Sequence, residues 1–225
     1  MRTDEIARLL VPFLNTPLTP AQLDTVSAHL DLLLRWNERV NLTAIRRPEE
    51  IIERHFGESF FAAQILSSRD WKGTIGDLGS GAGFPGVPIA IYAANAHVIL
   101  LESNSKKAAF LRELTRSLKT PRLSVYAGRA EEWLRDPRRQ RVDVVTLRAV
   151  EKFESTVPLA ASLLSEGDDA PGPAPNRKPD RRIALLIGAP QVESAKALAP
   201  GFAWQPPVPT PKSQSRVVLI GHLPS

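Results

Sequence analysis

The sequence predicts a doubly wound, mostly parallel α/β sheet preceded by an N-terminal helical extension. Three observations predict this fold class: 225 residues are enough for one good-sized domain, residues 1–70 carry helical patterns, and short apolar runs alternate with helical stretches from Gly73 onward. Such alternation is typical of βαβ units, whose helices cover both faces of a parallel sheet. We therefore expect a helical extension over residues 1–70 and a sheet domain over residues 71–225.

The helical extension contains a clear start signal. Thr19 and Gln22 have the spacing of a capping box, and Pro20 stands at the first helical position. Apolar residues then recur at helical intervals to about Val40. A second helix is expected from Pro48, with one stripe formed by Ile52, Phe56, Ser59 and Ala63.

The sheet domain contains several short apolar runs of strand length. Strands are expected at Thr74–Leu78, His97–Glu102, Leu123–Ala127, Val142–Leu147, Ile183–Ile187 and Arg216–His222. Helices are expected at Pro85–Ala94, Ser105–Leu118, Arg129–Leu134 and Phe153–Leu164. A segment at about residues 167–180 is rich in proline, glycine and charge, and it is expected to be a flexible surface loop.

The composition excludes several kinds of chemistry. The chain has no cysteine, which excludes disulfides, iron–sulfur clusters, thiolate zinc sites and cysteine nucleophiles. Its histidines lack metal-ligand spacing, so no metal is expected. The charged start of the chain does not resemble a secretory signal, and the apolar run from Pro85 to Leu101 is interrupted by polar residues. We expect a cytoplasmic, monomeric protein without a membrane segment.

The net charge of +5 is unevenly distributed. Residues 1–72 hold 9 Lys and Arg against 10 Asp and Glu, residues 103–141 hold 11 against 4, and residues 176–225 hold 7 against 2. A cationic cluster is typical of proteins that bind polyanions, and it is about as typical of an ordinary solvated surface. The charge alone therefore leaves a nucleic-acid partner open.

A glycine-rich loop follows the first expected strand. Gly81, Gly83 and Gly86 fit the G-x-G-x-x-G pattern of dinucleotide-binding proteins, with Asp77 and Gly79 ahead of them. In a dinucleotide enzyme the diphosphate lies at the N-terminus of the following helix, where an aspartate repels it. Asp77 is better suited to a cationic group or an amino group. S-adenosylmethionine carries both a sulfonium and an ammonium, and it has no phosphate.

Two further acidic positions fit a cofactor that contains adenosine. Glu102 closes the second strand 23 residues after Gly79, a position from which a carboxylate accepts hydrogen bonds from both ribose hydroxyls. The loop after the third strand, Gly128 to Glu132, is expected to frame the adenine. These positions favour S-adenosylmethionine, and a nicotinamide-dependent oxidoreductase that binds NAD remains the alternative.

Two absences narrow the reaction of a methyltransferase. Methylation of pyrimidine C5 normally uses a cysteine nucleophile, which this chain lacks. Enzymes that methylate exocyclic amines typically carry an Asn/Asp-Pro-Pro-aromatic run after the fourth strand, where this chain reads Thr146 to Val150. A purine ring nitrogen such as guanine N7 has an available lone pair and needs no general base. Orientation and electrostatics would then supply the rate, and no catalytic residue is assigned.

Several motifs occur together in an order that is typical of one family. They are Asp77 to Gly86, Leu100 to Leu111, Gly128 to Glu132 and Leu147 to Ala149, and the helical part adds Trp36-Asn-Glu-Arg-Val-Asn-Leu-Thr43 and Arg54-His55. With these motifs the chain resembles the RsmG family, also called GidB, over about residues 20–150. The glycine loop alone is weak evidence, whereas Phe84-Pro-Gly-Val-Pro88 is unusual outside this family.

The resemblance implies a Rossmann-like, S-adenosylmethionine-dependent methyltransferase that modifies guanine N7 of 16S ribosomal RNA. It implies that this RNA, or the small ribosomal subunit, is the partner. Family contacts with the methyl donor, together with the loop residues, give the expected cofactor-binding set: Asp77, Gly79, Gly81, Gly83, Phe84, Glu102, Ala130, Glu131 and Arg148. The expected contacts with the RNA are Lys106, Lys107, Arg112 and Arg148.

The chain departs from the family pattern in its C-terminal third. Ile187 stands where the family usually has a lysine, and Glu58 stands where aspartate is common. The segment at about residues 167–180 resembles an insertion. These departures keep one more alternative open, namely a non-catalytic RNA-binding module that retains the pocket for S-adenosylmethionine.

Overall fold

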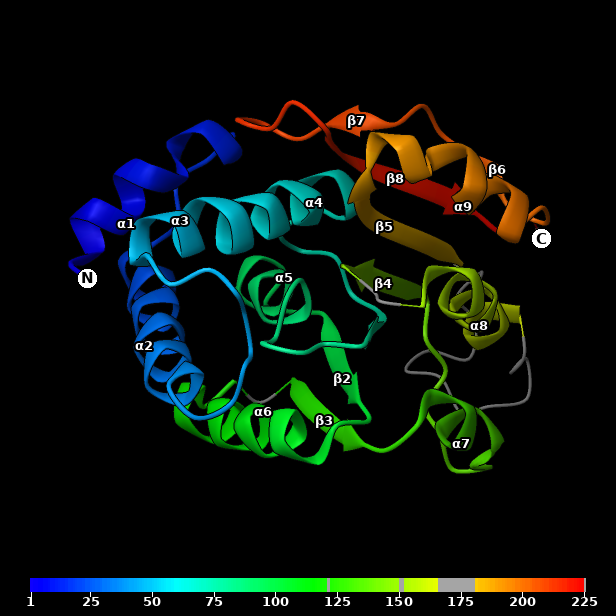
Figure 1. Cartoon of the computed structure of the whole chain (residues 1–225), viewed down its shortest axis with the longest axis horizontal. Helices are drawn as coiled ribbons and strands as arrows, with labels where there is room; N and C mark the ends of the chain where they lie inside the picture. Colours follow the sequence, from blue (N-terminus) through cyan, green and yellow to red (C-terminus); the bar gives the residue numbers. More distant parts are fainter. Residues whose placement is uncertain (121, 150–151, 166–180, 225) are drawn as a thin grey trace.

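Figure 1 shows the chain as a computed structural model, which describes residues 1–120, 122–149, 152–165 and 181–224. The flexible loop expected at about residues 167–180 lies outside the described residues. Within them, helices surround a central sheet (Figure 1).

The sheet contains the strands β1 (Thr74–Leu78), β2 (His97–Glu102), β3 (Leu123–Ala127), β4 (Val144–Arg148), β5 (Arg182–Gly188), β6 (Ala203–Trp204), β7 (Val208–Pro209) and β8 (Arg216–His222). Their order is β3-β2-β1-β4-β5-β8-β6, and β7 also pairs with β8. Neighbours among β1 to β5 are parallel, whereas β8 is antiparallel to β5. Each expected strand is present, so the prediction of a mostly parallel sheet is confirmed. The short strands β6 and β7 were not expected.

The helices are α1 (Thr3–Leu10), α2 (Pro20–Asn37), α3 (Pro48–Ile51), α4 (Glu58–Leu66), α5 (Gly86–Tyr92), α6 (Ser105–Leu118), α7 (Ala130–Arg135), α8 (Phe153–Ser165) and α9 (Val192–Leu198), with the short turns η1 (Val11–Phe13), η2 (Ile52–Gly57) and η3 (Ala189–Gln191). The expected capping box starts α2, because Thr19 Oγ1 accepts from the Gln22 amide and Gln22 Oε1 accepts from the Thr19 amide. In the described part of the chain, no helix is long and apolar enough to cross a membrane.

The helix expected from Pro48 changes its geometry at the centre. Between α3 and α4 the chain forms η2, a π-helical turn. Gly57 ends this turn directly against the ring of Phe13, where a Cβ atom would lie 2.6 Å from a ring carbon. A π-helical turn shifts the phase of the residues that follow it, and such turns occur frequently at functional sites. An amphipathic pattern in the sequence does not reveal this shift.

Alternate side chains of the strands are buried against helices on opposite faces of the sheet. In β2, Val98 and Leu100 belong to the same hydrophobic cluster as residues of α2, α4, α5 and α6. Ile99 and Leu101 belong to a second cluster with residues of α7, α8 and α9. Because both faces are covered, these strands consist of nearly continuous apolar runs, and the doubly wound arrangement is confirmed.

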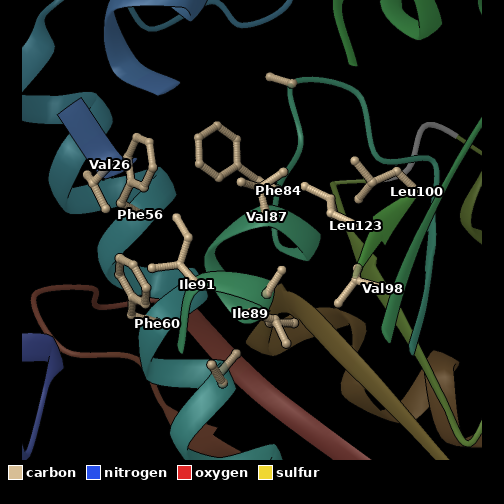
Figure 2. Packing of buried hydrophobic residues seen from close by; sticks show 14 of the residues in the cluster. Val26, Phe56, Phe60, Phe84, Val87, Ile89, Ile91, Val98, Leu100 and Leu123 are labelled. Atoms are coloured by element: carbon tan, nitrogen blue, oxygen red, sulfur yellow. The ribbon is translucent and has the colours of Figure 1, made fainter. Parts of the chain in front are cut away.

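The N-terminal helices share a hydrophobic cluster with the sheet. Figure 2 shows Phe56 of η2, Phe60 of α4 and Val26 of α2 packed near Phe84 and Val87, which belong to the glycine-rich loop and to α5. The rings of Phe56 and Phe84 meet edge to face, with their centroids 4.9 Å apart. The N-terminal helices therefore pack against the glycine-rich loop and help to fix its position.

Candidate cofactor pocket and its surroundings

A pocket of about 760 Å³ lies at the carboxyl ends of the parallel strands. It is lined by Leu78, Gly79, Leu101, Glu102, Ser103, Lys107, Gly128, Arg129, Ala130, Glu131, Ala149, Lys152, Ser155, Thr156 and Leu159. Open parallel sheets bind ligands at this edge, and the volume is typical of a small-molecule site. The structure thus brings together four of the expected cofactor contacts and one expected RNA contact: Gly79, Glu102, Ala130, Glu131 and Lys107.

The loop between β1 and α5 has a backbone that requires glycine. Gly79, Gly81 and Gly83 have φ angles of +72°, +56° and +88°, a region that side chains rarely adopt. At Gly83 a Cβ atom would lie 2.9 Å from Val87 Cγ2. At Gly81, in contrast, a Cβ atom would lie at an ordinary contact distance, 3.8 Å from the carbonyl oxygen of Gly79, so the requirement for glycine there comes from the φ angle.

The amide groups of this loop are already paired within the protein. Those of residues 79 and 80 donate to the carbonyl oxygen of Leu101, and those of residues 83 and 84 donate to the carbonyl oxygen of Ser80. The Gly81 amide donates to Glu102 Oε2 at 2.9 Å. A dinucleotide loop presents its amides to a diphosphate, whereas these five amides already donate to acceptors within the protein. The loop is therefore unsuited to a diphosphate, although its sequence fits the dinucleotide pattern.

Asp77 is almost completely buried, with 1% of its surface exposed, and it does not line the pocket. Its Oδ1 accepts a hydrogen bond from the Thr146 hydroxyl at 2.8 Å, and its Oδ2 accepts from the Gly86 amide at 3.1 Å. Burial raises the pKa of Asp77 to about 6, although hydrogen bonds from Thr146 and Gly86 act in the opposite direction. The carboxylate thus joins β1 to β4 and to the start of α5. Its direct contact with the amino group of a cofactor stays a prediction.

Glu102 lines the pocket and is held in one orientation by the backbone. Its Oε1 accepts from the Asn104 amide at 2.7 Å, and its Oε2 accepts from the Gly81 amide at 2.9 Å. Each carboxylate oxygen can accept a second hydrogen bond. Glu102 can therefore accept the hydroxyls of a ribose without losing its contacts with the loop.

The walls on either side of Glu102 come from the segments after β3 and β4. Ala130 and Glu131 begin α7, and Glu131 lies 3.7 Å from the guanidinium of Arg129. On the other side Ala149, with a φ of +50°, leads from β4 toward Lys152 and α8. In the sequence, the motif Leu147 to Ala149 indicated a cofactor contact for Arg148, but it gave no role to Ala149, Lys152 or the start of α8. Ligands bind where parallel strands end, and this rule applies to β4 as well. It is the signal in the sequence that predicts a pocket wall after this strand.

Phe84 lies in the hydrophobic cluster and not among the pocket-lining residues. Its ring stacks on the imidazole of His29, with centroids 4.9 Å apart and an angle of 13° between the planes. His29 Nε2 donates to the carbonyl oxygen of Ala82 at 2.9 Å, so α2 holds the glycine-rich loop directly. Burial lowers the pKa of His29 to about 4. The cofactor contact expected of Phe84 stays a prediction.

Arg148 also lies outside the pocket lining, although it ends β4. Only 7% of its side chain is exposed, and its guanidinium forms an ion pair with Glu58 at 3.2 Å. The same nitrogen donates to the carbonyl oxygen of Arg54 at 2.7 Å. The structure therefore places Arg148 in a buried ion pair that joins β4 to α4. Its expected contacts with the methyl donor and with the RNA stay predictions.

The basic helix α6 starts at the mouth of the pocket. Asn104 caps it by accepting from the amides of Lys106 and Lys107. Lys107 lines the pocket, whereas Lys106 and Arg112 are exposed on the outer side of the helix. Ile187, which stands where the resemblance leads one to expect a lysine, is buried near the end of β5.

The strand order, the antiparallel β8 and the pocket at the ends of β1 and β2 define a Rossmann-like protein with the fold of class I, S-adenosylmethionine-dependent methyltransferases. A solved precorrin-6y C5,15-methyltransferase from Geobacter metallireducens GS-15 has this fold. It superposes with a TM-score of 0.53 at 16% sequence identity, over 73% of this chain and 88% of that one.

The family can be assigned more narrowly from the sequence comparisons. The GidB family model, described as rRNA small subunit methyltransferase G, matches residues 22–170. The chain belongs to this family, and the resemblance found in its motifs is thereby confirmed.

Two relatives illustrate how far the similarity extends. Ribosomal RNA small subunit methyltransferase G from Janthinobacterium sp. (strain Marseille) is 31% identical over 214 residues, which cover 92% of this chain and 89% of that protein. The protein of the same name from Desulfitobacterium hafniense (strain Y51) is 37% identical over 163 residues, or 72% of this chain. The matched segment spans 66% of that relative, slightly less than two thirds of its length.

Proposed function

We propose that the protein transfers a methyl group from S-adenosylmethionine to guanine N7 of 16S ribosomal RNA, as a monomer in the cytoplasm. One observation carries the choice of cofactor: the Gly81 amide, which a diphosphate would need, donates to Glu102 Oε2. An anionic diphosphate beside this carboxylate is repelled, whereas a sulfonium or ammonium group is attracted. Membership of the GidB family supports methyl transfer to ribosomal RNA.

The residues around the pocket fit S-adenosylmethionine. Glu102 would accept the ribose hydroxyls, and Ala130 and Glu131 would face the adenine. The pocket wall formed by Leu78 and Gly79 would face the methionine portion. The mixed lining of leucines and charged groups suits a ligand with an apolar linker and polar ends.

The cofactor supplies an electrophilic methyl group, and guanine N7 supplies the lone pair. Glu102, Ala130 and Glu131 would hold the cofactor while this methyl group passes to N7 and the electrons of the S–C bond stay on sulfur as a neutral thioether. Because N7 carries no proton, the transfer needs no general base. The protein's share is to hold the donor, exclude water and align the acceptor, which suits a site without an acid–base pair.

The basic surface beside the pocket supports an RNA substrate. Lys107 lies in the pocket wall, and Lys106 and Arg112 continue along the exposed side of α6. Cations in such a row contact phosphates and make RNA binding dependent on salt. We expect these residues to position the RNA and not to take part in the transfer.

The proposal is tested with the purified chain, S-adenosylmethionine labelled in its methyl group, and 16S ribosomal RNA or small subunits that lack the modification. We expect label in the RNA as N7-methylguanosine. Glu102→Ala should weaken binding of S-adenosylmethionine about tenfold in calorimetry, because it removes the ribose acceptor. Binding of NAD without binding of S-adenosylmethionine would indicate an oxidoreductase. Retention of RNA without any transfer would indicate a non-catalytic binding module.

A further inference from the structure

A group of arginines meets at the carboxyl edge of β4 and β5, outside the pocket lining. Arg148, at the end of β4, and Arg216, at the start of β8, both donate to the same oxygen, Glu58 Oε2, at 3.2 and 3.0 Å. Arg54 adds its carbonyl oxygen as an acceptor for Arg148. Segments that are 90 and 158 residues apart in the chain therefore converge on one carboxylate.

This group contains more positive than negative charge. Arg54 forms an ion pair with Glu50, and Lys212 contacts Glu53, so these two cations are balanced. Glu58, in contrast, is shared between two guanidinium groups. Among the described residues, this sharing leaves one positive charge without a carboxylate. A charge that is largely removed from water is stable only with a counter-charge, so the arrangement favours the binding of an anion.

Two buried nitrogen atoms in this group lack hydrogen-bond partners. Arg148 Nε is inaccessible to solvent and has no acceptor among the described residues, and the same holds for Nδ1 of His55. His55 adds no charge of its own, because burial, together with the positive charges of Arg148, Arg54 and Arg216, lowers its pKa to about 2. The cationic character of the group is therefore carried by its arginines at all ordinary pH values.

Two side chains of this group are buried, and the other two form a partly exposed rim. The side chains of Arg148 and Glu58 are each 7% exposed, whereas those of Arg216 and Arg54 are 32% and 43% exposed. None of these residues lines the cofactor pocket, but Ala149, which follows Arg148 directly, does. Through Arg148 the group is thus joined in the chain to the pocket wall, while an anion at its rim would remain connected to the outside. This location suits a group on a polymer better than a carboxylate of the enclosed cofactor.

We propose that Arg216 and Arg54 bind a backbone phosphate of the RNA strand that presents its base to the pocket, and that Glu58 and Arg148 hold Arg216 in place from below. Guanidinium groups match the geometry of phosphate, and a phosphate contact sets the register of a strand without reading its sequence. The inference rests on the proposed function and assigns the anchoring point of its substrate. Arg216 and Arg54 would be positioning residues, since neither contacts the atoms that react.

The test compares Arg216→Ala, Arg54→Ala and Arg216→Lys with the control Arg2→Ala, which removes an exposed, ion-paired arginine from the start of α1. Binding of a 16S ribosomal RNA transcript is measured by fluorescence anisotropy at several salt concentrations, and binding of S-adenosylmethionine by calorimetry. We expect each alanine variant at the rim to bind RNA about tenfold more weakly, with a salt dependence reduced by about one phosphate contact. Arg216→Lys should keep part of the affinity, and Arg2→Ala should match the wild type.

The cofactor measurement separates the possible explanations. Unchanged affinity for S-adenosylmethionine in the rim variants shows that the pocket is intact and supports the phosphate site. Weaker cofactor binding with unchanged RNA binding overturns the proposal, since the rim would then hold the cofactor's carboxylate. Unchanged RNA binding and salt dependence in both alanine variants, or a wild type that does not bind the transcript, also overturn it. Loss of RNA affinity in a protein that never transfers a methyl group would contradict the proposed activity and leave the phosphate site supported.

Discussion

His29 should make the stability of the protein depend on pH, because its imidazole is fully buried between α2 and the glycine-rich loop. Burial lowers the pKa of His29 to about 4 from an ordinary value of 6.5. Below pH 6.5 the unfolded chain therefore binds a proton that the native protein does not. The contribution of the neutral His29 to the free energy of unfolding is fully present above the pKa of the unfolded chain, and it is lost as the pH falls from 6.5 to 4.

The size of the effect follows from the two pKa values. At pH 7 the imidazole is neutral in both states, so it contributes almost no pH dependence. At pH 5 the unfolded chain lies 1.5 pH units below its pKa of 6.5, while the native residue, with a pKa of about 4, is still mostly neutral. At 1.36 kcal/mol per unit, His29 alone lowers the free energy of unfolding by about 2 kcal/mol between pH 7 and pH 5.

The assay is urea unfolding of the wild type and of His29→Gln at pH 7 and pH 5. Glutamine can still donate to the Ala82 carbonyl oxygen and does not titrate. The variant should therefore lose about 2 kcal/mol less than the wild type over this interval. Val26→Ala, a buried change on the same helix, should lower stability equally at both pH values. Equal pH dependence in the wild type and His29→Gln would refute the assignment of a buried, neutral imidazole.

Three further predictions concern the loop and the basic helix. Gly83→Ala forces a side chain onto a φ of +88° and against Val87, so it should destabilise the protein by about 2 kcal/mol, which thermal unfolding would register as a fall of about 4–8 °C in Tm. Phe84→Ala should cost about 3–5 kcal/mol in urea unfolding, because it leaves a cavity beside His29 and Phe56; a loss below 1 kcal/mol would contradict the packing described. Lys106→Ala should reduce the slope of log affinity for RNA against log salt by about one, and an unchanged slope would remove this residue from the interface.

The strands and the glycine-rich loop were predictable because their signals are local. Apolar runs such as the one in β2 identify a strand that is buried on both faces, and glycines at positions 79, 81 and 83 supply the backbone angles of the loop. Glu102 lines the pocket because the end of β2 lies at the binding edge of the sheet, whereas its contact with a ribose stays a prediction. Each of these inferences needs only a few neighbouring residues.

The direction of a side chain was harder to predict. Phe84 and Arg148 follow the sequence motif of the family, yet the structure places one ring in the core and the other side chain against Glu58. Glu58 precedes Arg148 by 90 residues and follows a π-helical turn that the apolar pattern does not reveal. A contact over such a distance depends on the packing of α4 against the sheet, which no local signal in the sequence describes.

The choice between two cofactors also depended on the folded loop. The sequence shows that Gly81, Gly83 and Gly86 fit the dinucleotide pattern. It does not show that the Gly81 amide donates to Glu102, because this hydrogen bond joins the loop after β1 to the end of β2, 21 positions further along the chain. In the structure the carboxylate lies at the loop where a diphosphate would need the Gly81 amide, and this contact favours the proposed cofactor, which has no phosphate.

The shared carboxylate of Glu58 also constrains when the arginine group can form during protein synthesis. Arg216 is translated 158 residues after Glu58, and its strand β8 must pair with β5 before the guanidinium reaches the carboxylate. Without Arg216, the group holds one guanidinium for the Glu58 carboxylate, namely that of Arg148, and the excess charge is absent. A nascent chain still attached to the ribosome is surrounded by ribosomal RNA, the same polymer that the finished protein is proposed to bind. Because Arg216 lies on the last strand, the proposed phosphate contact would have to wait until β8 has joined the sheet.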